Sequence, residues 1–352
     1  MLVIMRADAS QEQMRLLGEK AVSEGFRVRA VPGRDLVFVV TGERRAPDPA
    51  TFAGQAGVAE TRSLRHGYEL ASREAHPDDT IVAVGGVPVG GRAFVVVGGP
   101  CAVESLEQTL AVARRVKAAG GHILRGGAFK PRTHPYSFQG LGEEGLKILA
   151  AAREETGLPV VTEALDVDQV DMVERYADAI QVGSRNMHNF PLLRRVGRSR
   201  KPVLLKRGFA ATLEEFLGAA EYVLAEGNDQ VVLCERGIRT FSDFSRNTLD
   251  LTIVPALKQV SHLPIIVDPS HAAGRRDMIV PLSRAGAAVG ADGVMVEVYE
   301  DPCVALCDGA QAVATDDFDL LMRQVGRVAE SVDRPLYKKA SRTLRAVAGS
   351  VA

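Results

Sequence analysis

The sequence predicts an α/β fold in which a (β/α)8 TIM barrel follows a small α+β domain of the ferredoxin-like type. The first observation is a regular alternation of strand-like and helix-like segments from Phe94 onward. The second is a shorter βαββαβ pattern over residues 1–67. The third is that polar or reactive side chains follow the ends of the later strands, where a barrel carries its site.

The composition is that of an ordinary globular protein. The chain has 352 residues, of which 46% are hydrophobic and 25% are charged, and its formal net charge is −1. This charge balance argues against non-specific binding to nucleic acid or to an anionic membrane. No apolar run approaches the length of a membrane span, and the opening residues MLVIMRADAS indicate a strand rather than a signal peptide. We therefore expect a cytoplasmic enzyme.

Residues 1–67 are expected to form a unit of their own. The apolar residues 2–5 predict a strand, and Ser10 is a capping residue that opens a helix. The further expected elements are strands at 26–28 and 36–40, a helix at 49–56 and a strand around 58–64. Small domains of this kind often bind regulatory ligands, and a packing appendage is the alternative.

A connector, residues 68–93, joins this unit to a catalytic barrel at 94–340, and residues 341–352 form a tail. The sequence GGVPVGG at 85–91 predicts a hairpin that closes the bottom of the barrel. The expected barrel strands are 94–99, 122–126, 159–164, 179–184, 202–207, 230–235, 264–268 and 293–298. The expected helices are 105–119, 142–156, 166–177, 189–195, 212–226, 248–260, 277–290 and one after 314.

A doubly wound open sheet is the alternative to the barrel. Such a sheet usually has fewer strands and a glycine-rich dinucleotide turn after its first strand. Here the first strand is followed by Gly98-Gly99-Pro100-Cys101, and no GxGxxG sequence is present. The barrel is therefore the preferred fold.

The segment LRGGAFKPRTHPYSFQG, residues 124–140, contains an uncompensated cluster of positive charge. Arg125, Lys130 and Arg132 lie close together with the hydroxyl of Thr133, and no acidic residue accompanies them. Arginine offers a planar fork to phosphate or carboxylate, and lysine a point charge. Two glycines allow a ligand to approach the backbone closely. The segment predicts a phosphate-binding loop, and a solvated basic loop is the alternative.

Further cations follow other predicted strands. The complete set at the strand ends and in this loop is Arg125, Lys130, Arg132, Arg185, Lys206 and Arg236. Brought together without counterions these side chains would repel one another, so we expect the pocket to take at least two anionic groups.

A second set of side chains has metal-binding chemistry. It consists of Cys101, His271, Glu297 and Asp308. A thiolate, an imidazole and two carboxylates together suit a first-row divalent ion such as Mn²⁺, Fe²⁺, Co²⁺ or Zn²⁺. The remaining cysteines do not form a disulfide framework, and Cys303 and Cys307 are either packed thiols or a redox-sensitive pair.

With these residues the sequence resembles the 3-deoxy-D-arabino-heptulosonate 7-phosphate (DAHP) synthases. It is most similar to the type I-beta branch, which carries an N-terminal ferredoxin-like regulatory domain. The matching motifs, in order, are GPCAVES (99–105), RGGAFKPRT (125–133), TEALD (162–166), GSRNMHNF (183–190), LLKRG (204–208), CERGIRTF (234–241), DPSHAAGRRD (268–277), VMVEV (294–298) and ALCDGAQ (305–311). The KPRT sequence favours this family over the related KDO-8-phosphate synthases.

The resemblance implies roles for individual residues. Phosphoenolpyruvate would contact Arg125, Lys130, Arg185, Lys206 and Arg236; Arg132 and Thr133 would hold the phosphate of erythrose 4-phosphate; Cys101, His271, Glu297 and Asp308 would bind one metal ion. Lys130 and Glu163 are the candidates for handling water and its protons, so the expected catalytic residues are Lys130, Glu163, Cys101 and His271.

The sequence also departs from the family pattern. His134 follows KPRT where a small hydroxyl residue is usual, which affects the expected shape of the aldose-phosphate pocket. Tyr299-Glu300 replaces a common His-Pro, and Cys307-Asp308-Gly309-Ala310 replaces the usual Ser-Asp-Gly-Pro, although Asp308 itself is retained.

The resemblance implies a metal-dependent transferase of the shikimate pathway, which leads through chorismate to the aromatic amino acids. It further implies allosteric regulation by Tyr or Phe at the N-terminal domain and a homotetramer. The alternatives are a KDO-8-phosphate synthase or a related phosphoenolpyruvate-dependent sugar-acid synthase. A non-catalytic ligand sensor is a remote alternative.

Overall fold

The computed structural model describes residues 1–31, 34–42, 44–63, 67–132 and 134–339. Two expectations, the C-terminal tail 341–352 and the contribution of Thr133, therefore lie outside the described residues. Within the described part of the chain, no helix is both long and apolar enough to cross a bilayer.

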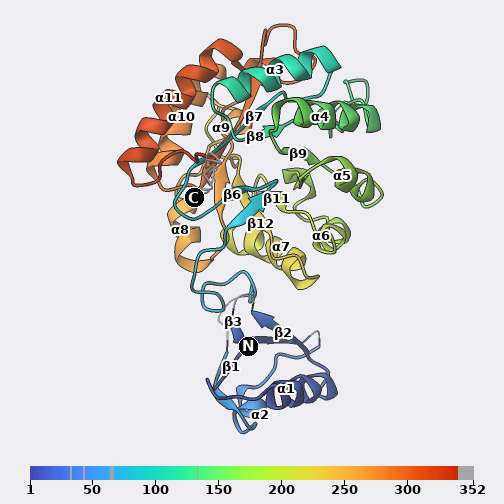
Figure 1. Ribbon diagram of the computed structural model, residues 1–352, viewed down its shortest axis with the longest axis vertical. Helices are drawn as coiled ribbons and strands as arrows, with labels where there is room; N and C mark the ends of the chain where they lie inside the picture. The colour runs from blue at the N-terminus through green and yellow to red at the C-terminus, as the bar shows by residue number, and fades with distance from the viewer. Residues whose placement is uncertain (32–33, 43, 64–66, 133, 340–352) are drawn as a thin grey trace, which may run out of the picture.

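A closed, parallel, eight-stranded sheet forms the larger part of the molecule (Figure 1). Each strand pairs in parallel with the next, and β14 pairs with both β13 and β7, which closes the ring. The strands are β7 Val95–Gly99, β8 Ile123–Arg125, β9 Val160–Glu163, β10 Ala179–Val182, β11 Val203–Lys206, β12 Val231–Glu235, β13 Ile265–Val267 and β14 Gly293–Tyr299. The predicted (β/α)8 barrel is confirmed, and the open doubly wound sheet is excluded.

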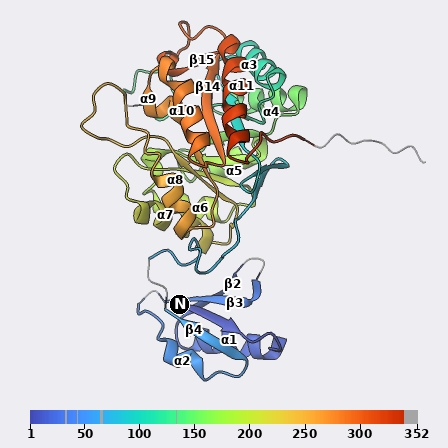
Figure 2. The same cartoon turned by 90° about the vertical axis from the view of Figure 1, so that its left-hand side faces the viewer.

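Helices surround this barrel and cover its outer face (Figures 1 and 2). They are α3 Leu106–Ala118, α4 Glu143–Thr156, α5 Val170–Tyr176, α6 Phe190–Gly197, α7 Leu213–Ala225, α8 Ile253–Val260, α10 Arg276–Ala288 and α11 Thr315–Ser331. Local sequence fixes several of their starts: Ser105 caps α3, and Thr212 forms a capping box with Glu215 at α7. Buried apolar side chains between the strands and helices form the main core.

Some helices differ from the expected bounds. Helix α5 begins at Val170 rather than at 166, because Asp166 accepts a hydrogen bond from the backbone of Gln169 and forms a turn instead. Helix α8 begins at Ile253 rather than at 248, since the loop before it is held by the bridge between Ile238 and Thr248. Short elements that the pattern did not predict are η1 Ser184–Asn186, α9 Pro269–Ala273, η2 Gly309–Gln311 and β15 Val313–Ala314.

A two-stranded hairpin, β5 Val82–Val84 and β6 Val87–Val89, packs against one end of the barrel interior. Its turn, residues 85–86, consists of two glycines with φ of +52° and +86°, which suits the tight turn that joins such strands. Four valines of the hairpin lie in one buried cluster with inward-facing residues of the barrel strands: Val95, Val97, Ile123, Val161, Leu204, Val232, Ile266 and Met295. This end of the barrel is therefore packed with apolar side chains, which leaves the opposite end for polar chemistry.

The N-terminal residues form a separate four-stranded antiparallel sheet in the order β2-β3-β1-β4. Its elements are β1 Leu2–Met5, α1 Gln11–Ser23, β2 Arg27–Val31, β3 Arg34–Thr41, α2 Pro49–Ala53 and β4 Val58–Arg62. This is the βαββαβ order of the split βαβ arrangement. Helix α2 is shorter than the expected 49–56, because the chain turns at Gly54.

This sheet lies beyond one end of the barrel (Figure 1). Arg29 of β2 forms an ion pair of 2.5 Å with Asp229, in the loop before β12. Glu221 of α7 accepts hydrogen bonds from the backbone nitrogens of Leu70 and Ala71, in the connector. Because Asp229 precedes its strand, the contact with the N-terminal sheet is made at the end of the barrel where the strands begin.

Candidate active site

A cavity of about 300 Å³ opens at the end of the barrel where the strands finish. Because parallel strands finish at the same rim, side chains far apart in sequence meet there. The described residues predicted to bind substrate all line this cavity, namely Arg125, Lys130, Arg132, Arg185, Lys206 and Arg236. Glu163, His271 and Asp308 line it as well, whereas Cys101 and Glu297 are buried next to it.

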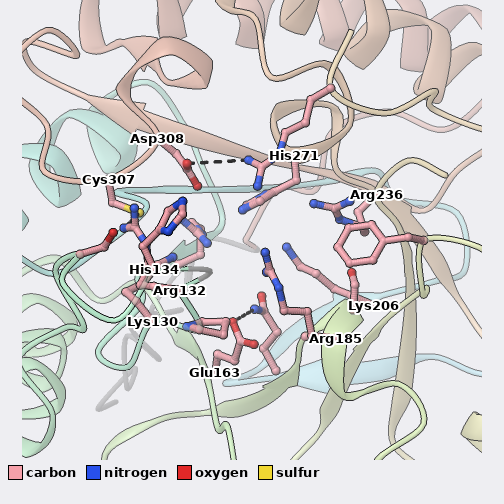
Figure 3. A pocket seen from close by; sticks show the side chains of 18 residues that line it. Lys130, Arg132, His134, Glu163, Arg185, Lys206, Arg236, His271, Cys307 and Asp308 are labelled. Atoms are coloured by element: carbon pink, nitrogen blue, oxygen red, sulfur yellow. Dashed lines mark hydrogen bonds and ion pairs between the residues drawn. The ribbon is translucent and has the colours of Figure 1, made fainter. Parts of the chain in front are cut away.

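The cations are distributed around the cavity wall (Figure 3). Arg185, Lys206 and Arg236 gather on one side, and Arg132 lies on the other side with His134 and Cys307. Lys206 and Arg236 are each only 3% exposed. Burying so many positive groups in one space is unfavourable unless negative charge lies nearby or arrives with a ligand.

Hydrogen bonds to backbone carbonyls and to neighbouring side chains hold Arg125 and Lys130 in place. The Arg125 guanidinium donates to the Pro100 carbonyl at 2.7 Å and to Glu297 at 3.1 Å. The Lys130 ammonium donates to the carbonyl and to the Sγ of Cys101, both at 3.1 Å. A Cβ at Gly127 would lie 2.7 Å from the Lys130 side chain, so the second glycine of the predicted loop makes room for this lysine.

Arg236 is a buried cation with a hydrogen-bond donor that the described residues leave unsatisfied. Its guanidinium stacks over the ring of Phe209 at 4.6 Å, and Arg185 approaches the same ring at 5.7 Å. One buried nitrogen of Arg236, Nη1, has no hydrogen-bond partner among the described residues. Burial lowers the pKa of this guanidinium. A buried donor without a partner is costly, and an anion in the cavity would satisfy it.

The four predicted metal ligands come together. One ligand atom from each of Cys101, His271, Glu297 and Asp308 lies within 4.8 Å of the others. A hydrogen bond to Cys307 and burial raise the pKa of the Cys101 thiol well above its ordinary value. Burial raises the pKa of Glu297 to about 7. A divalent ion would replace these protons, and the sulfur, nitrogen and oxygen donors together fit a first-row metal.

Asp308 is presented by an unusual backbone conformation. Its φ of +53° lies in the left-handed region, which aspartate tolerates better than most residues. Arg246 lies 3.7 Å from its carboxylate and also donates to Gln311 at 3.0 Å. Gln311 in turn donates to Glu297 at 2.8 Å. Asp308 and Glu297, two of the predicted metal ligands, are thus linked through Arg246 and Gln311 by one ion pair and two hydrogen bonds.

Cys307 lies at the centre of the loop that departs from the usual sequence. Its Sγ is 3.2 Å from the Sγ of Cys101 and accepts a hydrogen bond from Arg132 at 2.8 Å. The hydrogen bond from Cys101 lowers the pKa of the Cys307 thiol. Cys303, by contrast, is exposed, and the structure records both residues as free thiols. The two cysteines therefore lie in different environments.

Glu163 has a defined partner on the wall of the cavity. Its carboxylate accepts a hydrogen bond of 2.9 Å from Gln181 of β10. A Cβ at Gly183 would lie 2.0 Å from Glu163 Oε1, so the glycine of the GSRN segment makes room for the carboxylate. Glu163 is 8% exposed and faces the same space as the cations.

Several residues of the site lie outside the predicted set. Asp268 follows β13 directly and contacts both Lys206 and His271, and its strand-end position is the signal that could have identified it. Burial opposes ionisation of Asp268, but its interactions with His271 and Lys206 outweigh this effect and hold its pKa well below the usual range. Arg246 and Phe209 come from irregular loops, where no periodic pattern marks them.

Comparison with known proteins assigns this arrangement to a family. The DAHP synthetase I family matches residues 79–334. Phospho-2-dehydro-3-deoxyheptonate aldolase of Thermotoga maritima is 44% identical over 333 residues, which cover 94% of this chain and 98% of the relative. The crystal structure of that DAHP synthase superposes with a TM-score of 0.77 at 43% identity, covering 96% of this chain and 99% of the other.

A second group of relatives is more distant. The 2-dehydro-3-deoxyphosphooctonate aldolase of Geobacter sulfurreducens is 31% identical over 263 residues, which cover 69% of this chain and 96% of the relative. The barrel, its cation-lined cavity and these similarities agree, and the chain belongs to the DAHP synthetase I family.

Proposed function

We propose that this protein is a DAHP synthase, which condenses phosphoenolpyruvate with D-erythrose 4-phosphate and water to give DAHP and inorganic phosphate. This is the first step of the shikimate pathway, which leads to chorismate and the aromatic amino acids. The observation that carries the proposal is one cavity that joins six predicted cations to a four-donor metal site. Membership of the DAHP synthetase I family supports it.

Phosphoenolpyruvate is the ligand that best fits the larger group of cations. It brings a phosphate and a carboxylate on one small carbon skeleton, which match the requirement for two anionic groups. We assign its contacts to Arg125, Lys130, Arg185, Lys206 and Arg236. The unpartnered nitrogen of Arg236 supports this assignment, since an anion supplies the missing acceptor.

Erythrose 4-phosphate is assigned to the other side of the cavity, with Arg132 on its phosphate, and the same role for Thr133 rests on the sequence alone. Arg132 lies across the cavity from Arg185 and Lys206 (Figure 3). Its present partner is the Cys307 sulfur, which a phosphate oxygen would replace as the stronger acceptor. His134 lines the same side, where it limits the space for the sugar.

One divalent ion, Mn²⁺, Fe²⁺, Co²⁺ or Zn²⁺, is assigned to Cys101, His271, Glu297 and Asp308. When bound, such an ion supplies Lewis-acid polarisation of the aldehyde carbonyl. Cys101 and His271 take part in catalysis by holding it. Lys130 donates to Cys101 and also lines the cavity, so the metal site and the substrate site share a boundary.

The reaction forms one carbon–carbon bond and exchanges the carbon–oxygen bond to phosphate for one to the oxygen of water. One proton of that water goes to the former aldehyde oxygen, and the other leaves with the phosphate. The methylene carbon of phosphoenolpyruvate attacks the aldehyde carbon, and water adds at the carbon that bears the phosphate. Loss of inorganic phosphate from that carbon then gives the product. Glu163 and Lys130 are assigned to the proton transfers of the water and the leaving group. The surrounding cations position both substrates and stabilise the negative charge that moves between them.

The N-terminal sheet suggests a type I-beta enzyme regulated by an aromatic amino acid, Tyr or Phe, and assembled as a homotetramer. Among the described residues, none that lines the cavity comes from residues 1–67. Within one subunit, an effector bound to this domain would therefore lie away from the cavity, with the connector and the Arg29–Asp229 contact as its links to the barrel. The cytoplasmic location expected from the sequence stays a prediction.

The substrate pair is tested by phosphate release from phosphoenolpyruvate, with erythrose 4-phosphate and arabinose 5-phosphate in parallel reactions. Release is expected with erythrose 4-phosphate and Mn²⁺, and EDTA should abolish it. Preference for arabinose 5-phosphate would instead assign the protein to the KDO-8-phosphate synthases, the second candidate function, with which it shares 31% identity through the Geobacter relative. Release with neither sugar would contradict both assignments.

Replacing Cys101 with alanine should remove the thiolate ligand and lower metal affinity by more than about 100-fold. Even residues that only hydrogen-bond to a metal ligand change metal affinity by about 10–100-fold when they are replaced. Metal content after dialysis and phosphate release are the measurements. Cys303→Ala is the matched control, because Cys303 is exposed. A folded Cys101→Ala protein with full metal content and full turnover would contradict the ligand assignment.

Replacing Glu163 with glutamine should lower kcat by about 100–10,000-fold, the usual contribution of a general acid or base. Metal content and the KM for phosphoenolpyruvate should remain close to those of the wild type. Glu154→Gln, on the exposed face of α4, serves as the control for the same chemical change. Unchanged turnover in Glu163→Gln would remove this residue from the mechanism.

Regulation is tested by adding Tyr or Phe to the full chain and to a chain that lacks residues 1–67. One of the two amino acids should inhibit the full chain, and the shortened chain should not respond. Full activity of the full chain in both amino acids would refute the regulatory assignment.

A further inference from the structure

Asp268 connects the proposed substrate site to the proposed metal site through a single oxygen atom. Its Oδ2 lies 2.5 Å from the Lys206 ammonium and 2.7 Å from His271 Nδ1. Its other oxygen, Oδ1, accepts from the backbone nitrogen of His271 at 3.0 Å. The side chain is 0% exposed, does not line the cavity and has no part in the proposed chemistry.

Helix capping explains only half of these contacts. Asp268 is the N-cap of the short helix α9, and the bond from Oδ1 to the His271 backbone accounts for that function. The contacts of Oδ2 with two functional side chains are a separate feature. Serine or asparagine caps a helix as well as aspartate does, but neither provides a buried negative charge between Lys206 and His271.

The contact with His271 determines which imidazole nitrogen faces the metal donors. A carboxylate acceptor at Nδ1 places the imidazole proton on that nitrogen. The lone pair is then on Nε2, which lies 3.2 Å from Glu297 Oε1 within the donor cluster. A hydrogen-bonded carboxylate also makes an imidazole a better metal ligand.

The contact of Asp268 with Lys206 makes the hydrogen bond between Asp268 and His271 sensitive to bound substrate. Lys206 lines the cavity, so an anion bound there draws on the same ammonium that now donates to Asp268. When the Lys206 ammonium donates to the anion, its hydrogen bond to Oδ2 of Asp268 weakens. Oδ2 then accepts more strongly from His271 than it does in the protein without the anion. In the protein without ligands, Lys206 and His271 therefore compete for Oδ2 of Asp268. When an anion binds Lys206, Oδ2 is left to His271, so each ligand should favour binding of the other.

We propose that Asp268 is a positioning residue that couples phosphoenolpyruvate binding to metal binding through its shared Oδ2 atom. The proposal rests on the proposed function, because it needs an anion at Lys206 and a metal at His271. Coupling between two sites is reciprocal, so each ligand should raise the affinity of the other by the same factor.

The test is calorimetric titration of the metal-free full chain with Co²⁺, with and without saturating phosphoenolpyruvate and without the second substrate. In the wild type, phosphoenolpyruvate should lower the Kd for Co²⁺ by about fivefold or more, the lower end of typical coupling. In Asp268→Asn and Asp268→Ser, Co²⁺ should bind about 10–100-fold more weakly. The factor contributed by phosphoenolpyruvate should also fall in both variants, to less than about twofold.

A matched control is Asp48→Asn, which changes the N-cap of α2 in the N-terminal sheet. It should bind Co²⁺ as the wild type does and keep the same response to phosphoenolpyruvate. If the Asp268 variants do not fold, Lys206→Gln provides the second measurement, since it keeps Asp268 and removes its competing partner. Co²⁺ alone should then bind at least as tightly as in the wild type, and the response to saturating phosphoenolpyruvate should be lost.

The outcomes distinguish a failure of the positioning role of Asp268 from a failure of the proposed function. Wild-type coupling that persists in folded Asp268→Asn and Asp268→Ser, or in Lys206→Gln, overturns the positioning role and leaves the proposed function intact. A wild type that binds neither Co²⁺ nor phosphoenolpyruvate overturns both. Coupling present in the wild type and the cap control and lost in the Asp268 variants supports the proposal.

Discussion

Closure of the parallel sheet between β14 and β7 is the constraint on which the whole site depends. The register places Val294 opposite Val96 and Glu297 opposite Gly99, two residues before Cys101. This pairing joins the last barrel strand to the first, so donors separated by nearly two hundred residues share one small volume. A Cβ at Gly99 would lie 1.9 Å from the Arg125 carbonyl oxygen, so the close approach of β7 to β8 also requires glycine there.

The electrostatics of the cavity follow from this convergence. Several buried cations are compensated within the protein, as in the pairs Arg125–Glu297 and Lys206–Asp268. Buried pairs of this kind contribute little net stability, because the desolvation of both ions offsets their attraction. Arg236 has a buried nitrogen with no partner among the described residues. The cavity thus contains a buried donor that these residues leave without a partner, which destabilises the protein until a ligand supplies the acceptor. Such local costs are typical of functional sites.

The sequence was sufficient to predict the barrel and most of the candidate site, for a physical reason. Apolar runs mark the buried strands, and the polar residue after each run marks the rim, so Arg125, Glu163 and Lys206 could be placed together without knowledge of packing. Periodicity gave less information about the irregular loops. Arg246 reaches the cavity from the segment between β12 and α8, where the backbone is fixed by hydrogen bonds that have no repeating pattern.

The predicted metal ligands and the predicted substrate-binding cations come from different arcs of the ring. Cys101 follows β7, His271 and Glu297 belong to the β13–β14 side, and Asp308 lies beyond β14, whereas the predicted cations come from β8 through β12. The two arcs nevertheless touch, because Lys130 contacts Cys101 and Asp268 contacts both Lys206 and His271. A substitution at one of these contacts therefore affects both arcs. Sequence change confined to one arc is therefore easiest on the part of the rim away from these contacts, where Arg185 lies against the ring of Phe209.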